Sequence, residues 1–154
     1  MKRSLLILLA FLALPGTAFA KGPSAATITG PGLLHPIVLF GKESNQSSRL
    51  HRLVDVAGFF PATFGQSPDP MLKVRPAGVL GPRYTIVWVV PGPNGASRIQ
   101  QYVYPYAKPG ALSWMIPGER FWSSERTYGG WFRGGIELKR VLVAVGLPAS
   151  APAV

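Results

Sequence analysis

The sequence predicts a single α+β domain in which a small antiparallel sheet packs against two amphipathic helices. Three observations lead to this fold class. Residues 48–57 and 136–145 each repeat apolar side chains at the i, i+3, i+4, i+7 spacing of one buried helix face. Residues 84–106 are rich in β-branched and aromatic residues around an Asn-Gly pair, a pattern that favours a hairpin. The 16 prolines and 18 glycines fall between short apolar runs, which is typical of a loop-rich domain.

The first twenty residues have the organisation of a secretory signal peptide. Lys2 and Arg3 precede an apolar run that closes with Ala18-Phe19-Ala20, where small residues fit a signal-peptidase site. The apolar run is too short to span a bilayer. The chain has no cysteine, which excludes both a disulfide framework and an anchor attached to cysteine. We therefore expect cleavage after Ala20 and a secreted product, extracellular or associated with the cell wall, that has no membrane span once the signal is removed.

The rest of the chain has the length of one domain, which we place at residues 33–148. Residues 21–32 show no hydrophobic periodicity and are expected to form a flexible lead. Residues 149–154 are expected to form a disordered tail.

The two predicted helices have similar stop signals. Gly58 follows the first helix and Gly146 follows the second, and glycine readily adopts the left-handed conformation that ends a helix. Pro61 is expected to prevent the first helix from continuing. Ser47 or Ser48 is the expected N-cap of the first helix. The apolar faces consist of Leu50, Leu53, Val54 and Ala57 in the first helix and Leu138, Val141, Leu142 and Val145 in the second.

The central hairpin is expected to join strands at Tyr84–Val90 and Ile99–Tyr106. With Asn94 and Gly95 as the two turn residues, Val89 pairs with Gln100 and Val87 pairs with Tyr102. This register places three tyrosines on one face of the sheet, at positions 102, 104 and 106.

Three further segments have strand character. Leu112–Ile116 is expected to be a third antiparallel strand and Pro36–Phe40 a fourth, because both are short apolar runs bounded by glycine or proline. Met71–Val74 is a weaker candidate for an edge strand.

The charge of the chain is strongly positive. The formal net charge is +10, and Lys2 and Arg3 account for two of these charges, which leaves +8 on residues 21–154. Such a field attracts anionic lipids, wall polymers and other polyanions, although it specifies no chemistry. The arginines are scattered, no nucleic-acid motif occurs, and export separates the product from nucleic acid, so we do not expect nucleic acid as a partner.

Groups suited to catalysis are scarce. The chain has two histidines and six acidic residues in no metal-binding pattern, so we expect neither a metal nor another cofactor. His51 and Asp55 lie one helical turn apart and could form a histidine–carboxylate pair, although such a pair is more often a surface contact. Glu119 and Glu125 could act as acid and base in glycoside cleavage. Each is followed by an arginine, and ion pairing is expected to keep both ionised.

A set of six polar and aromatic residues falls in predicted loops or strand ends, where binding groups are usually carried. Arginine offers a planar fork for phosphate or carboxylate, and indole offers an apolar plane for a sugar ring or a base. In the alternative interpretation Asp69 caps a turn, Arg83 pairs with a carboxylate and the tryptophans are core residues. The six candidate ligand-binding residues are Gln66, Asp69, Arg83, Arg120, Trp122 and Trp131.

Four motifs resemble segments of uncharacterised exported proteins of actinobacteria. They are GFFPATFGQSPDP at 58–70, LGPRY at 80–84, YPYA at 104–107 and TYGGWF at 127–132. The resemblance runs from about Gly30 to Pro148 and implies a secreted single domain with no assigned activity and no catalytic residues to carry over.

Two functions from different classes agree with these observations. The first is an exported, non-catalytic binding module whose ligand is an anionic component of the cell envelope or a partner protein. The alternative is a small secreted hydrolase that acts on wall glycans or esters through Glu119, Glu125 or His51. Carboxylates facing each other across a cleft would favour the hydrolase, whereas a shallow arginine and aromatic patch would favour binding.

Overall fold

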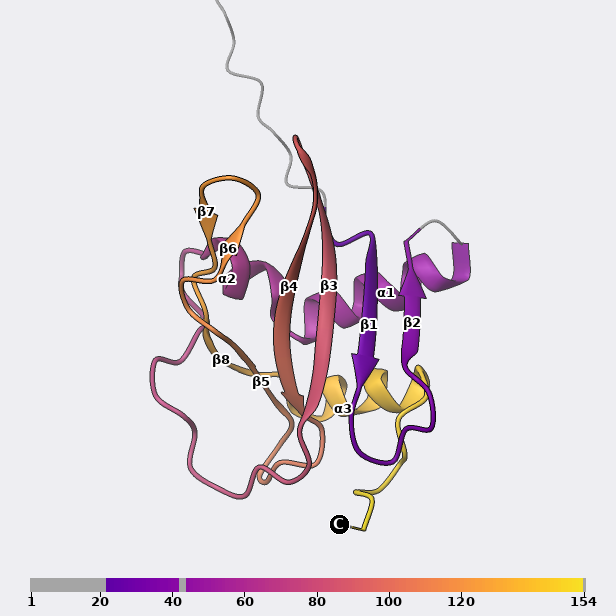
Figure 1. Ribbon diagram of the computed structural model, residues 1–154. Helices are drawn as coiled ribbons and strands as arrows, with labels where there is room; N and C mark the ends of the chain where they lie inside the picture. The colour runs from indigo at the N-terminus through magenta and orange to yellow at the C-terminus, as the bar shows by residue number, and fades with distance from the viewer. Residues whose placement is uncertain (1–21, 42–43, 154) are drawn as a thin grey trace, which may run out of the picture.

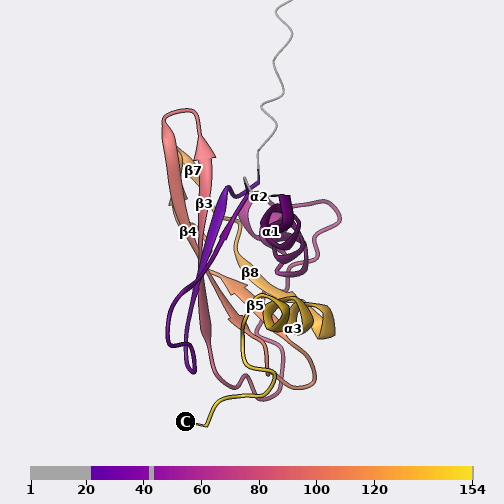
Figure 2. The same ribbon diagram turned by 90° about the vertical axis from the view of Figure 1, so that its right-hand side faces the viewer.

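A six-stranded antiparallel sheet with all helices on one side forms the framework of the molecule (Figures 1 and 2). The computed structural model describes residues 22–41 and 44–153. The expected signal peptide, residues 1–20, lies outside the described residues. The strand order is β2-β1-β3-β4-β5-β8, and the α+β fold class is confirmed. The strands of this sheet are β1 (Ala25–Thr29), β2 (Ile37–Phe40), β3 (Tyr84–Gly92), β4 (Gly95–Tyr104), β5 (Leu112–Met115) and β8 (Gly130–Arg133).

The remaining elements are three helices and a small separate hairpin. The hairpin pairs β6 (Arg120–Phe121) with β7 (Glu125–Arg126). The two predicted helices are confirmed as α1 (Ser44–Val56) and α3 (Gly135–Ala144). The predicted N-cap is wrong, because α1 begins at Ser44 and both Ser47 and Ser48 lie inside it. A third helix, α2 (Phe59–Phe64), was not predicted, because Pro61 was interpreted as a stop signal. Pro61 lies in the first turn of α2, where its missing N–H has no helical partner to lose.

The prediction of a flexible lead at residues 21–32 is wrong, because β1 lies between β2 and β3 and pairs with both. Ala26 and Ile28 are fully buried, while Thr27 and Thr29 point to the other face of the sheet. The alternation has the period of a strand. Its inward residues include small alanine, so the hydrophobic signal in the sequence is weak.

The hairpin is confirmed, but its predicted register is shifted by two residues. Gly92 pairs with Gly95, so Pro93 and Asn94 form the turn, and Val87 lies opposite Gln100. Proline at the second position and glycine at the fourth suit a tight turn of this kind. Because the shift is even, side chains keep their predicted faces.

The strand β4 ends at Tyr104, so Tyr106 does not share the face of Tyr102 as predicted. Tyr106 instead packs beside Tyr84, with ring centroids 6.2 Å apart, and its hydroxyl donates to the carbonyl of Pro148 at 2.5 Å. The strand predicted at 112–116 is confirmed as β5, and that at 36–40 as β2. Residues 71–74 form only an isolated bridge, between Leu72 and Trp131.

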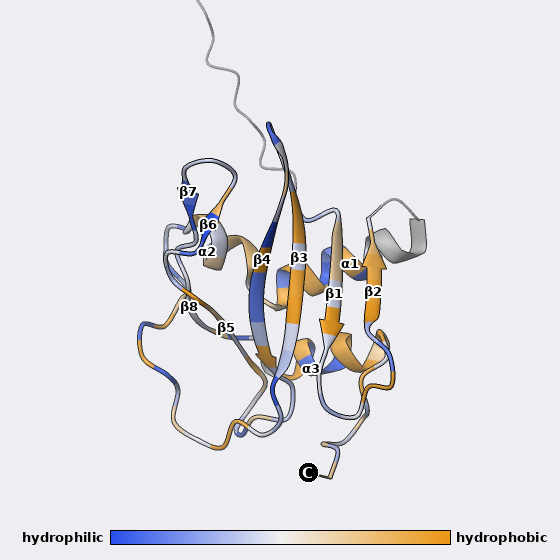
Figure 3. Cartoon of the chain, viewed as in Figure 1, coloured by the Kyte–Doolittle hydropathy of each residue, from blue (hydrophilic) through white to orange (hydrophobic). Residues whose placement is uncertain are grey.

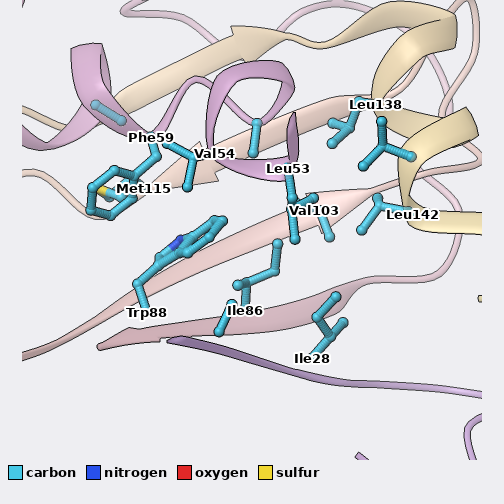
Figure 4. Close-up of a cluster of buried hydrophobic side chains, with 14 of the residues drawn as sticks. Ile28, Leu53, Val54, Phe59, Ile86, Trp88, Val103, Met115, Leu138 and Leu142 are labelled. Carbon is cyan, nitrogen blue, oxygen red and sulfur yellow. The ribbon is translucent and has the colours of Figure 1, made fainter. Parts of the chain in front are cut away.

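The main core lies between the sheet and the helices (Figure 4). Trp88 from β3 packs against Phe59 of α2, with ring centroids 5.0 Å apart. Leu53 of α1 and Leu142 of α3 are fully buried, as their helical spacing predicts. The last residues, 149–153, form no helix or strand, and Pro152 lies against Gly32.

A buried polar network ties the end of α1 to the sheet. The Gln101 amide accepts a hydrogen bond from the Trp88 indole at 3.0 Å and donates to the carbonyl of Ala57 at 2.7 Å. Ser113 donates to the same carbonyl at 2.6 Å. A carbonyl at a helix end has no partner within the helix, so these bonds satisfy a group that burial would otherwise penalise.

Candidate ligand-binding face

The sheet has one face without helices, which we call the open face (Figure 2). Thr85, Val87 and Val89 of β3 alternate with fully buried core residues and are half-buried on this side. The hydropathy of the strands differs, with hydrophilic residues over much of β4 and hydrophobic residues along β3 and β2 (Figure 3). Because antiparallel sheets commonly leave one face to solvent, this arrangement is physically ordinary, and the side chains on the face decide its chemistry.

Three aromatic side chains form a row across the open face, at the end of the sheet that β8 borders. Tyr102 of β4, Trp114 of β5 and Trp131 of β8 lie directly opposite one another in the strand register. The rings of Tyr102 and Trp114 stack with centroids 5.6 Å apart, and those of Trp114 and Trp131 are 5.9 Å apart. All three are half-buried. We call these three residues the aromatic row.

A second, small apolar cluster packs beside the aromatic row on the same face of the sheet. Leu112 of β5 and Tyr104 of β4 are buried, and the Tyr104 ring lies 5.7 Å from that of Trp131. The long loop between α2 and β3 returns along this side and adds Leu80. Loss of rotamer freedom on binding is therefore small, because packing already holds the rings in place.

Arginines border the aromatic row. The Arg83 guanidinium lies 4.6 Å from the centroid of the Tyr102 ring, in a cation–π contact. Arg133 lies opposite Leu112 on the same face, and Arg98 lies opposite Val89. All three arginines are exposed, and among the described residues none is paired with an acidic side chain. The interpretation that Arg83 pairs with a carboxylate is thus wrong, and the face presents cationic donors.

Of the six candidate residues, Arg83 and Trp131 lie at opposite ends of the aromatic row, and Arg120 and Trp122 lie elsewhere. Arg83 adjoins the first residue of β3, whereas Trp122 packs against Gly92, the last residue of β3. At about 3.3 Å per residue, these two ends of β3 lie about 25 Å apart. Arg83 and Arg120 therefore do not form one site, because the chain from 117 to 122 returns beside the tip of the β3–β4 hairpin (Figure 1).

Trp122 fastens the β6–β7 hairpin to the sheet. Its backbone N–H donates to the Ser97 hydroxyl at 2.7 Å, and its ring lies 5.8 Å from that of Phe64. A side chain at Gly92 would meet the Trp122 indole at 2.2 Å, so only glycine allows this close approach. Trp122 has φ of 50°, a strained conformation for a tryptophan. Trp122 therefore packs between the β6–β7 hairpin and the sheet, and these contacts assign it a structural role.

Asp69 caps a turn, as the alternative interpretation expected. Its carboxylate accepts the N–H of Met71 and the hydroxyl of Tyr128, both at 2.8 Å, and lies 3.4 Å from the Lys73 ammonium. The hydrogen bond from Met71, followed by that from Tyr128, lowers the pKa of Asp69. Gln66 is exposed and lines a shallow hollow of about 340 Å³ together with Asp55 and Phe132. Phe132 alternates with Trp131 along β8, so this hollow lies behind the open face.

Among the described residues, no hydrogen bond or ion pair joins the acid–base candidates to one another. His51 and Asp55 are exposed on α1, and no hydrogen bond joins them. Burial raises the pKa of Glu119, while the N–H of Gln100 acts in the opposite direction. Glu125 is exposed on β7. Neither glutamate forms the expected ion pair with an arginine among the described residues, and Arg126 donates instead to the carbonyl of Gly118 at 3.0 Å.

The sequence interpretation missed Tyr102, Trp114 and Arg133 as members of this surface. Their relation depends on the register between β4, β5 and β8, which joins residues from three separate segments. The strand β8 was not predicted, and only the pairing of the strands shows that Trp114 and Trp131 share one face.

The described residues offer neither a metal site nor a helix that could span a membrane. Within residues 22–41 and 44–153, no three histidine or acidic side chains gather as metal ligands. No helix in that part of the chain combines the length and hydrophobicity that crossing a bilayer requires. Comparison with protein-family models, with curated proteins and with solved structures finds no match to this chain.

Proposed function

We propose that this protein is an exported, non-catalytic binding module whose open face binds an anionic polysaccharide of the cell envelope. The observation that carries the proposal is the aromatic row bordered by Arg83 and Arg133, neither of which has an acidic partner among the described residues. Export and a location at the envelope come from the signal-peptide pattern and from the resemblance to exported proteins.

The chemistry of the face suits such a polymer. Indole and phenol rings offer apolar surface to the less polar side of a sugar ring, together with donor groups at their edges. A guanidinium makes paired, charge-assisted hydrogen bonds with a carboxylate, sulfate or phosphate on the chain.

The test is a titration of the purified protein with polygalacturonate, an anionic chain, and with dextran, a neutral one. Binding of polygalacturonate is expected, and Trp114→Ala and Arg83→Gln should each weaken it about tenfold, as for a central contact of an interface. Phe40→Ala is the matched control, because Phe40 is an exposed aromatic residue on β2 at the far edge of the sheet. If Trp114→Ala and Phe40→Ala lose the same amount of binding, and if the parent protein loses all binding in 0.5 M salt, where the Debye length is about 4 Å, only diffuse attraction would be left.

The hydrolase remains a second candidate because of one observation, the raised pKa of Glu119. A carboxyl that stays protonated closer to neutral pH is suited to a general acid. Its expected partner Glu125 is exposed on a two-residue strand, which provides little positioning. Release of reducing sugars from isolated cell walls by the parent protein, and its loss in Glu119→Gln, would favour the hydrolase over the binding module.

A further inference from the structure

Residues of α1 and α3 line a groove. Both helices lie on the side of the sheet opposite the open face (Figure 2). The groove has a volume of about 280 Å³. Its rim consists of Arg49 and Arg52 from α1 and Arg140 from α3, and its floor consists of Val141, Ala144 and Val145 from α3. Neither the aromatic row nor the acid–base candidates take part in it.

The rim of the groove has an excess of positive charge. Glu137 contacts Arg140 on the same helix and lies 3.9 Å from Arg52, so this one carboxylate is shared between two guanidinium groups. Arg49 has no acidic partner among the described residues. All three arginines are exposed, so their donors are available to an incoming anion.

The floor of the groove is apolar. Val141 is buried, Val145 is half-buried and Ala144 is exposed, so an apolar strip lies directly beside the guanidinium groups. A free inorganic anion gains nothing from such a strip, because it has no apolar surface to bury. A ligand that carries a hydrocarbon segment next to its charge uses both parts.

The size of the groove decides between classes of ligand. A stable protein partner buries at least about 1,200 Å² in total, which a hollow with six lining residues does not supply. The volume matches the lower end of small-molecule pockets, about 300 Å³. One lipid headgroup, together with the first carbons of its acyl chains, has a size that suits a groove of this volume.

We propose that the groove between α1 and α3 binds the headgroup phosphate of an anionic phospholipid at a membrane surface. The guanidinium groups of Arg49, Arg52 and Arg140 hold the phosphate, and the glycerol end of the acyl chains lies on Val141, Ala144 and Val145. This inference does not rest on the function proposed for the open face.

The test measures co-sedimentation of the purified mature protein, residues 21–154, with vesicles of phosphatidylcholine alone and of phosphatidylcholine with one quarter phosphatidylglycerol. The protein is expected to sediment only with the anionic vesicles. Arg49→Gln/Arg52→Gln/Arg140→Gln should weaken that binding at least tenfold, because about three charges act at the surface. The control Arg75→Gln/Arg120→Gln/Arg126→Gln removes the same charge from exposed loop and hairpin positions and should retain most of the binding.

Two single variants separate the site from a loss of folding. Arg49→Gln removes the arginine without an acidic partner, leaves the contacts of Glu137 intact, and should weaken binding severalfold. Ala144→Asp changes an exposed floor residue and should abolish binding, since it adds a like charge beside the phosphate. Both variants should keep the circular dichroism spectrum and melting temperature of the parent.

Three outcomes would overturn the proposal. The first is an equal loss of binding in the two triple variants, which would mean attraction by net charge alone. The second is parental binding by Ala144→Asp. The third is complete release of the protein from the vesicles by glycerol phosphate or by an acidic peptide, at a concentration equal to that of the anionic lipid. Either result would show that the lipid chains contribute nothing to binding.

Discussion

Single residues in this fold are most constrained where polar groups are buried. Gln101 is fully buried in β4, between the Trp88 indole and the carbonyl at the end of α1. Its neighbour Gln100 is exposed on the open face. Gln100 and Gln101 are adjacent but have opposite surroundings, because side chains alternate between the two faces of a strand. The amino-acid composition alone does not reveal which glutamine is buried.

Replacing Gln101 with leucine is expected to destabilise the protein by about 1–3 kcal/mol, because the Trp88 N–H then lacks an acceptor inside the core. Denaturant unfolding of Gln101→Leu measures this cost. Gln100→Leu is the matched control and should stay within about 0.5 kcal/mol of the parent. Equal stability of the two variants would mean that the network does not hold the sheet to α1.

Glu119 is expected to destabilise the folded protein as the pH rises. Its folded-state pKa is raised by burial, so the carboxyl binds its proton more tightly in the folded than in the unfolded chain. This contribution to stability is present below the unfolded pKa, near 4.5, and is lost as the pH rises through the folded-state value. The difference in unfolding free energy between Glu119→Gln and the parent should therefore grow in favour of the variant from pH 4 to pH 7. Parallel stability curves for the two proteins would contradict a raised pKa.

At the scale of elements, the sequence predicted helices better than strand positions. The apolar spacing around Leu53 and Leu142 located both long helices, because a helix face is local in sequence. The strand β1 was missed, since its inward positions include alanine and its two partners, β2 and β3, lie in other segments of the chain. Pairing between distant segments also explains why the sequence predicted only part of the candidate site. Arg83 and Trp131 were chosen as loop and strand-end residues, whereas Tyr102 and Trp114 acquire their role only through pairing between strands.

The helix faces and β1 can be tested together. Leu53→Ala, Leu142→Ala and Ile28→Ala each truncate a fully buried side chain, from α1, α3 and β1 respectively. Each should destabilise the protein by about 2–5 kcal/mol through lost burial and the cavity that remains. Leu34→Ala, at a side chain that is 95% exposed, should be nearly neutral in the same unfolding experiment. A neutral Ile28→Ala would restore the interpretation of residues 21–32 as a flexible lead.

At the scale of the whole molecule, the layered architecture separates two cationic surfaces. The aromatic row, Arg83 and Arg133 lie on the open face. The groove between α1 and α3 lies on the other side of the sheet, where the helices pack (Figure 2). One layer of sheet and one of helices stand between them, so a polymer on one surface does not block a membrane on the other. Positive charge on both sides also accounts for a high net charge without a single cluster of basic residues.

This separation predicts that one molecule binds both ligands at once. Vesicles with one quarter phosphatidylglycerol, loaded with the protein, should capture fluorescent polygalacturonate, whereas the same vesicles without protein should repel it. Trp114→Ala should weaken capture about tenfold while leaving the protein on the vesicles, because Trp114 lies on the open face. The triple variant of Arg49, Arg52 and Arg140 should abolish capture by leaving the protein in solution with the polysaccharide bound. Release of the parent protein from vesicles by polygalacturonate would instead show that the two anions compete for one surface, because independent sites on opposite sides give no such coupling.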